Sequence, residues 1–258
     1  MSPARFVTKA TAAVVAVGGG RGVLVHTSTP EVPVVLTAAH CLPHLPPAHP
    51  ASYTYERTYR DLLGPLGGPA DITAECVFVD PIADLAVLAS PDGQAIPDEA
   101  EAFDAFVAAR SALTVEAMTH RGRAWVLTLE GRWEACRVDV GRRGRTLTLV
   151  GAHTRNGMSG SPILDAYGRV VGVVSVGAET GGVEEHENHG QPAIVSNVPP
   201  WLLSELWPVT GLDVVLAEQD RAWERYLRRG RPRSRRGTPR QRARMPQERR
   251  SAGPRPPR

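Results

Sequence analysis

The six residues Gly157-Met158-Ser159-Gly160-Ser161-Pro162 place a glycine on each side of the Met158-Ser159 pair and end on a proline. A turn of this composition presents the Ser159 hydroxyl outward. Because Gly157 has no Cβ, a substrate can approach the backbone closely. The backbone N–H groups of the turn then point at one place, where they can hold a developing oxyanion. The same six residues also fit an ordinary glycine-rich hairpin turn. A serine hydroxyl is a weak nucleophile, so the first interpretation needs a base elsewhere in the chain.

Two other stretches supply a candidate base and a candidate acid. His40 follows the apolar residues 32–37, so the end of a strand presents its imidazole. Asp84 enters the apolar run Leu85-Ala86-Val87-Leu88, where a carboxylate needs a hydrogen-bond partner. Each residue also has a simpler interpretation, His40 as a structural histidine and Asp84 as a turn residue.

Short valine-rich runs separated by glycine and proline predict an all-β protein. The strands that we expect in the first half cover residues 12–17, 22–27, 32–37, 51–59, 72–79 and 85–90. Those in the second half cover residues 113–118, 124–129, 133–140, 145–150, 163–165, 169–175 and 193–198. An acidic connector over residues 91–112 separates the two halves, and Phe103, Phe106 and Val107 at helical spacing predict a short helix within it.

The carboxyl-terminal part differs in composition. We expect helices over residues 199–227, including an amphipathic one between Leu212 and Tyr226. Residues 228–258 hold thirteen arginines and one acidic residue, a charge of +12. Since the whole chain carries +3, residues 1–227 carry −9. With few apolar residues this arginine-rich tail is expected to be disordered. It can be solvated, bind a polyanion such as RNA or DNA, or fold back on the acidic body.

Cysteine usage and the amino terminus bear on location. The three cysteines Cys41, Cys76 and Cys136 cannot all pair within one chain and lack metal-ligand spacing. We therefore expect a reducing, cytoplasmic compartment. Arg5 and Lys9 before the apolar residues 10–17 resemble a short signal peptide, but the same run also fits a first strand. No apolar stretch reaches the ~20 residues of a membrane span.

In the order His, Asp, Ser, the three stretches resemble the trypsin/chymotrypsin-like serine proteases. Thr37-Ala38-Ala39-His40-Cys41 matches the histidine motif of that family, and Gly157–Pro162 matches its nucleophile motif. The run that begins at Asp84 is nearest the bacterial HtrA/Deg kind. The resemblance covers roughly residues 10–207.

The resemblance implies two six-stranded antiparallel β-barrels, one over residues 1–90 with His40 and Asp84, the other over residues 113–198 with Ser159. It implies that Ser159 attacks a peptide carbonyl, His40 moves its proton, and Asp84 holds the imidazole. The backbone N–H groups of Gly157 and Ser159 are then the oxyanion hole. No metal or cofactor is implied.

The implied substrate cleft runs along the strand that contains Ser175, Val176 and Gly177. His153 resembles the family position at the base of the specificity pocket, with Gly177 and Ala193 as walls. Without an acid at the base, a shallow pocket for small or medium side chains is expected. His153 can equally be a loop residue that faces solvent.

Three departures from the family pattern stand out. Met158 replaces the aspartate that pairs with a new amino terminus in the digestive members. Cys41 lacks the partner cysteine expected in the preceding strand, where we place Val25. No peptide-binding module follows, unlike in the HtrA/Deg kind.

These observations predict a serine endopeptidase that acts on polypeptides. Two alternatives remain open. One is a protease-fold binding module that the arginine-rich tail tethers to nucleic acid or another polyanion. The other is a protease that stays latent until a protein partner engages the helix between Leu212 and Tyr226.

Overall fold

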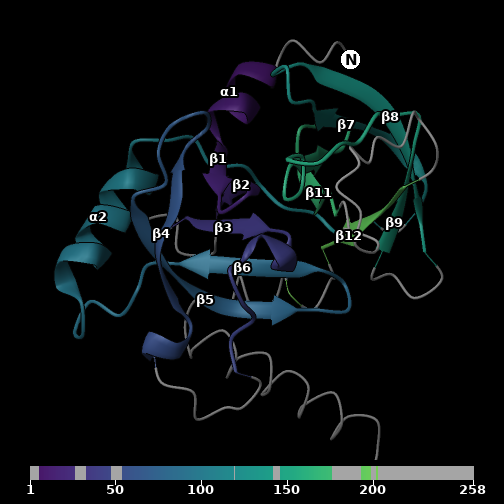
Figure 1. Cartoon of the computed structure of the whole chain (residues 1–258). Helices are drawn as coiled ribbons and strands as arrows, with labels where there is room; N and C mark the ends of the chain where they lie inside the picture. The colour runs from purple at the N-terminus through teal and green to yellow at the C-terminus, as the bar shows by residue number, and fades with distance from the viewer. Residues whose placement is uncertain are drawn as a thin grey trace, which may run out of the picture. The chain divides into compact units, whose positions relative to one another are not determined.

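A computed structural model describes residues 6–26, 33–47, 54–118, 120–141, 146–175, 193–198 and 202. Two closed antiparallel β-barrels of six strands each dominate this part of the chain, as the family resemblance implies (Figure 1). The expected tail at 228–258 lies outside the described residues. So do the expected helices at 199–227, except for Leu202, which is helical and buried.

The first barrel has the strand order β1-β2-β3-β6-β5-β4 and closes through pairing of β1 with β4. Its strands are β1 (Val14–Val17), β2 (Gly20–Val25), β3 (Val34–Thr37), β4 (Thr58–Pro65), β5 (Ile72–Asp80) and β6 (Leu85–Ala89). Helix α2 (Pro97–Ala108) follows it and buries Phe103, Phe106 and Val107 against the core of this barrel. The helix predicted in the connector is confirmed.

The second barrel has the order β10-β11-β12-β9-β8-β7 and closes through pairing of β10 with β7. Its strands are β7 (Gly122–Leu127), β8 (Trp133–Val140), β9 (Thr146–Val150), β10 (Pro162–Leu164), β11 (Val170–Val173) and β12 (Ala193–Asn197). Every pairing in both barrels is antiparallel, so short turns suffice to join neighbours along the chain.

One expected strand begins two residues later than predicted, and two other strand predictions are wrong. Residues 7–12 form helix α1 (Val7–Ala12), and the strand expected from residue 12 begins at Val14. Residues 54–56 form one turn of 3-10 helix, and the strand expected at 51–59 begins only at Thr58. At residues 113–118, Leu113 and Val115 make only isolated bridges. Valine and alanine side chains fit a strand or a buried helix equally well, so the apolar pattern alone does not separate the two.

Apolar side chains form one core in each barrel and a third cluster between the barrels. In the third cluster, residues of β2, β3 and β6 pack against Leu113, Leu164 and Val170. Ala10 of α1 is fully buried there, which favours the interpretation of residues 10–17 as part of the fold. Each Å² of apolar surface removed from water stabilises the fold by about 25 cal/mol, so this cluster links the barrels strongly.

Among the described helices, none is long and apolar enough to cross a membrane.

Candidate active site

The Ser159 turn joins β9 to β10 of the second barrel and is held by backbone hydrogen bonds on both sides. The Gly160 N–H donates to the Val174 carbonyl at 2.7 Å, and the Ser161 N–H donates to Met158 at 2.8 Å. Gly160 adopts φ +77°, and a Cβ there would lie 1.7 Å from the Arg21 carbonyl oxygen. The turn therefore requires glycine at this position, because neither the dihedral angle nor the space accepts a side chain.

His40 lies in a single turn of 3-10 helix (Ala39–Cys41) that follows β3 of the first barrel. Its Nε2 is 2.8 Å from Ser159 Oγ, and its Nδ1 is 2.7 Å from Asp84 Oδ2. Because a carboxylate only accepts, Nδ1 carries the proton, and a neutral imidazole then accepts the Ser159 proton at Nε2. The side chains of His40, Asp84 and Ser159 thus form one hydrogen-bonded row that joins the two barrels.

Asp84 ends the turn between β5 and β6 in the left-handed region, with φ +53°. Its Oδ1 accepts the His40 backbone N–H at 2.9 Å, and its Oδ2 also accepts the Ser175 hydroxyl at 2.5 Å. Burial by itself raises the pKa of Asp84. The hydrogen bonds from the His40 ring, Ser175 and the His40 backbone outweigh burial, so the net pKa is lowered. The carboxyl group is therefore held as the anion that an Nδ1–H donor requires.

Ser196 of β12 supports the same turn from the second barrel. Its hydroxyl lies 2.5 Å from the Ala83 carbonyl and 2.9 Å from the Asp84 carbonyl. The hydroxyl is fully buried and fixes a backbone segment in a conformation that costs about 1–3 kcal/mol. Ser196 is not identifiable from the sequence, since nothing in a short strand marks one serine as the contact of a distant turn.

The two N–H groups expected in the oxyanion hole belong to Gly157 and Ser159. Within the described part of the chain neither donates a hydrogen bond to another protein group. Ser159 itself is 7% exposed, and Gly157 adopts φ +86°. Two donors beside a serine hydroxyl are the arrangement that stabilises charge on a carbonyl oxygen during acyl transfer.

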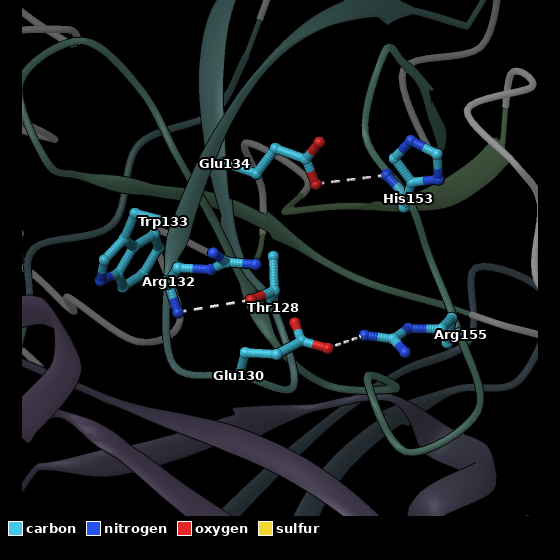
Figure 2. A pocket seen from close by; sticks show the side chains of 7 residues that line it. All are labelled: Thr128, Glu130, Arg132, Trp133, Glu134, His153 and Arg155. Carbon is cyan, nitrogen blue, oxygen red and sulfur yellow. Dashed lines mark hydrogen bonds and ion pairs between the residues drawn. The ribbon is translucent and has the colours of Figure 1, made fainter.

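His153 does not join the hydrogen-bonded row. It lines a cavity of about 430 Å³ between the β7–β8 turn and residues 153–155, together with Thr128, Glu130, Arg132, Trp133, Glu134 and Arg155 (Figure 2). In this view Glu134 reaches the His153 backbone N–H at 3.3 Å, and the Glu130 carboxylate faces the Arg155 guanidinium. The hydrogen bond from the Arg155 guanidinium is the main cause that lowers the pKa of Glu130 to about 2.

Of the other four residues expected in the substrate pocket, the structure describes only Ser175 and Ala193. Ser175 is half-buried and bonds Asp84, as described above. Ala193 belongs to β12, and Val176 and Gly177 lie outside the described residues. A smaller cavity of about 230 Å³ borders His40 and Asp84 directly, with Leu42, His44 and Leu45 among its lining residues. The smaller cavity therefore adjoins the hydrogen-bonded row, and the cavity that His153 lines does not.

The cysteine position proposed at Val25 is wrong. A Cβ built on Gly20 would lie 2.6 Å from Cys41 Sγ, so Gly20 is the residue that faces this thiol. Val25 belongs to the cluster between the barrels, whereas Cys41 belongs to the core of the first barrel. Counting along a strand cannot find the facing residue, because strand pairing decides it.

All three cysteines are free and buried. Burial raises the pKa of Cys41, and raises those of Cys76 to about 11 and Cys136 to about 12. Thiols in this state are poor nucleophiles, so the described cysteines do not compete with Ser159 for that role. Over the described ranges, no group of three or more His, Cys, Asp or Glu residues is placed to hold a metal ion.

Comparison with solved structures finds similar chains at low identity. They include the Rv3671c protease in an inactive form (19% identity, TM-score 0.42, covering 76% of this chain and 91% of that one). A serine protease of human pathogenic astrovirus matches at 15% identity, TM-score 0.44, covering 74% and 92%. A serine endoprotease from Yersinia pestis matches at 16% identity, TM-score 0.43, covering 80% and 65%.

Comparison with curated protein sequences gives no match. The model of the trypsin-like peptidase domain matches residues 20–173, which is more than half of the 258-residue chain. That stretch contains His40, Asp84 and Ser159. The chain belongs to the trypsin-like peptidase domain family.

Proposed function

We propose that this protein is a serine endopeptidase that hydrolyses peptide bonds through Ser159, His40 and Asp84. The observation that carries the proposal is the unbroken row of hydrogen bonds, 2.8 Å from Ser159 to His40 and 2.7 Å from His40 to Asp84. Both distances are short enough for direct proton transfer without a bridging water. Membership of the peptidase family supports the same reaction class.

In the proposed reaction, Ser159 Oγ attacks the carbonyl carbon of the peptide bond while its proton moves to His40 Nε2. The negative charge on the carbonyl oxygen is held by the backbone N–H groups of Gly157 and Ser159. His40 then gives the proton to the leaving amine, and an ester with Ser159 remains. Water, deprotonated by His40, cleaves that ester and restores the serine hydroxyl. Asp84 keeps the proton on Nδ1 and stabilises the imidazolium throughout.

The proposed substrate is a polypeptide, and its binding residues are proposed as His153, Ser175, Val176, Gly177 and Ala193. The side chain entering the pocket is proposed to be small or medium, since a histidine and not an acid stands at position 153 and an alanine at position 193. Glu134, which accepts the His153 backbone N–H, and Glu130 place two carboxylates in the same cavity, so a basic side chain is the competing outcome of the test. Cleavage profiling on a peptide library tests this preference, with Ser159→Ala protein as the blank.

An active-site-directed fluorophosphonate tests the reaction class. The wild type should be labelled at Ser159, and Ser159→Ala should not be labelled. Ser90→Ala is the matched control, because the Ser90 hydroxyl bonds only the Ala100 carbonyl in the described structure. Peptidase turnover of Ser159→Ala and of His40→Ala should fall at least ~10⁴-fold. Equal labelling of wild type and Ser159→Ala would refute the proposal.

A second proposal concerns the arginine-rich tail at residues 228–258, whose charge is +12. Arginine attracts phosphate without regard to sequence, so the tail is proposed to tether the barrels to RNA, DNA or another polyanion. The full chain should shift a labelled RNA at low salt and lose the shift as salt rises. A chain truncated after Leu227 should not shift it. Tethering without peptidase activity would make the protein a binding module.

Regulation and location are proposals of the same kind. A protein partner is proposed to engage the segment between Leu212 and Tyr226 and to activate the enzyme. High turnover of the purified chain alone would exclude that. A reducing, cytoplasmic compartment is proposed because Cys41, Cys76 and Cys136 are all free.

A further inference from the structure

Arg21 is a buried cation at the boundary between the barrels. It belongs to β2 of the first barrel and is 6% exposed. Arginine is seldom buried to this extent unless other polar groups satisfy its donors. Burial lowers the pKa of the Arg21 guanidinium, against the opposing influence of the Glu130 carboxylate.

The guanidinium of Arg21 crosses into the second barrel and binds the turn between β7 and β8. Its Nη1 donates to the Thr128 carbonyl at 2.9 Å and to the Leu127 carbonyl at 3.3 Å. Its Nη2 donates to the Leu129 carbonyl at 3.5 Å. These acceptors are successive backbone carbonyls, which the planar fork of an arginine can serve at once and a lysine ammonium cannot serve in the same geometry.

The same residue also binds the turn that carries the proposed nucleophile. Its Nη1 lies 3.4 Å from the hydroxyl of Ser161, a fully buried side chain, and its backbone N–H donates to the Ser159 carbonyl at 2.7 Å. On the other side, the Arg21 carbonyl accepts the Thr37 hydroxyl at 2.7 Å. Thr37 ends β3, the strand that leads to His40. Arg21 therefore connects the strand before His40 to the turn of Ser159.

A third contact extends this connection to the candidate oxyanion hole. The Leu129 side chain lies 3.6 Å from the point where a Cβ on Gly157 would stand. Since Arg21 holds the Leu129 carbonyl, it also fixes the residue that borders Gly157. No contact with a substrate is needed for this effect.

We infer that Arg21 is a positioning residue, which holds the β7–β8 turn and the Ser159 turn in register with His40 across the barrel boundary. The inference rests on the proposed peptidase function. Loss of the guanidinium leaves the carbonyls of residues 127–129 and the Ser161 hydroxyl without this donor, so the β7–β8 turn is no longer tied to the serine turn. The backbone bonds of residue 21 to Ser159 and Thr37 remain. A displacement of about 1 Å at the reacting groups lowers the rate roughly 10²-fold.

The test compares Arg21→Met and Arg21→Lys with Arg110→Met. Arg110 is the matched control, because its Nη1 also donates to a backbone carbonyl, that of Phe106 at 2.6 Å, but on helix α2 of the first barrel. With a peptide substrate, Arg21→Met should lower kcat about 10²-fold and change KM little, since positioning acts on the reacting groups and not on substrate contacts. Arg21→Lys should not restore kcat. Arg110→Met should keep the wild-type kcat.

Chemical rescue separates positioning from general loss of stability. Arg21→Ala should regain fluorophosphonate labelling when methylguanidinium is added, whereas the same amount of methylammonium should have no effect. If all Arg21 variants that remain folded by circular dichroism label at the wild-type rate, the inference is overturned and the proposed peptidase function stands.

Amide hydrogen exchange tests the inference without activity. The amides of Gly160 and Ser161 should exchange faster in Arg21→Met than in the wild type and be unchanged in Arg110→Met. Unchanged exchange in Arg21→Met overturns the inference. If the wild type itself is not labelled at Ser159, the proposed function fails, and the exchange result alone decides whether Arg21 holds the serine turn.

Discussion

At the scale of single residues, Gly160 shows how tightly the serine turn meets the first barrel. A Cβ there would lie 1.7 Å from the Arg21 carbonyl oxygen and 2.7 Å from Thr37 Oγ1. Arg21 belongs to β2, and Thr37 ends β3, the strand that leads to His40. The glycine is thus required by a contact between distant segments, not only by the φ of +77°.

Gly67→Ala provides a control for Gly160→Ala, because Gly67 has φ +80° and nothing within 4 Å of the added Cβ. We expect Gly67→Ala to cost about 1–2 kcal/mol of unfolding free energy for the backbone conformation alone. Gly160→Ala should cost about 1–3 kcal/mol more, because its Cβ overlaps backbone atoms. Urea unfolding measures both values. Equal losses of unfolding free energy in the two variants would contradict this, because the Arg21 backbone would then yield to the added Cβ at no cost.

We expect the difference in unfolding free energy between the wild type and Asp84→Asn to depend on pH in the acid range. Its folded-state pKa lies below the unfolded value, so ionised Asp84 stabilises the folded protein at pH above about 4. This contribution is lost as the pH falls below about 4 through the folded-state pKa. Asp84→Asn cannot titrate, so the gap in unfolding free energy between wild type and Asp84→Asn should narrow over that range. Urea unfolding at several pH values measures it, and a constant gap would contradict it.

At the scale of elements, α2 shows what periodicity can predict. The helix begins at Pro97, with Asp98 and Glu99 in its first turn, and these residues favour a helix amino terminus. The spacing of Phe103, Phe106 and Val107 puts them on one face, and that face is buried. A local pattern was sufficient here, because the helix is long enough to show its period.

Phe103→Ala should therefore destabilise the first barrel. Phe103 is fully buried in the core of that barrel, and replacement of such a side chain by alanine costs about 3–5 kcal/mol. Glu101→Ala on the exposed face of the same helix should change stability by less than about 0.5 kcal/mol. Thermal or urea unfolding of the two variants measures the contrast. Similar values would mean that α2 does not pack as described.

Shorter elements were harder to predict. The stretch over residues 113–118 has the alternation of a strand, but only Leu113 and Val115 make bridges. Whether such a stretch pairs along its length depends on the free edges of neighbouring strands, and in a closed barrel those edges are already used. Similarly, α1 is only six residues long, too short for its period to show against the valine-rich residues that follow.

At the scale of the whole described molecule, the cluster between the barrels joins their stabilities. Its members come from α1, from strands of both barrels and from Leu202, and most of them are fully buried. Such a boundary resembles a domain core more than a docking surface. The barrels should therefore unfold together.

The buried thiols report on this prediction. Cys76 belongs to β5 of the first barrel and Cys136 to β8 of the second. Both have a raised pKa, so neither should be alkylated in the folded protein. In pulse alkylation across a urea series, read by mass spectrometry, the two should become reactive at the same midpoint. Separate midpoints would show that the barrels unfold independently.

The sequence alone determined the family resemblance, and through it the two-barrel fold class and the choice of His40, Asp84 and Ser159 as candidate site residues, because short contiguous motifs carry that resemblance. Only the tertiary structure decided that Arg21 and Ser196 brace those motifs, that Gly20 and not Val25 faces Cys41, and that His153 lines a cavity apart from the row. Such contacts join residues far apart in the chain, and strand register and barrel closure set them, which no local pattern encodes.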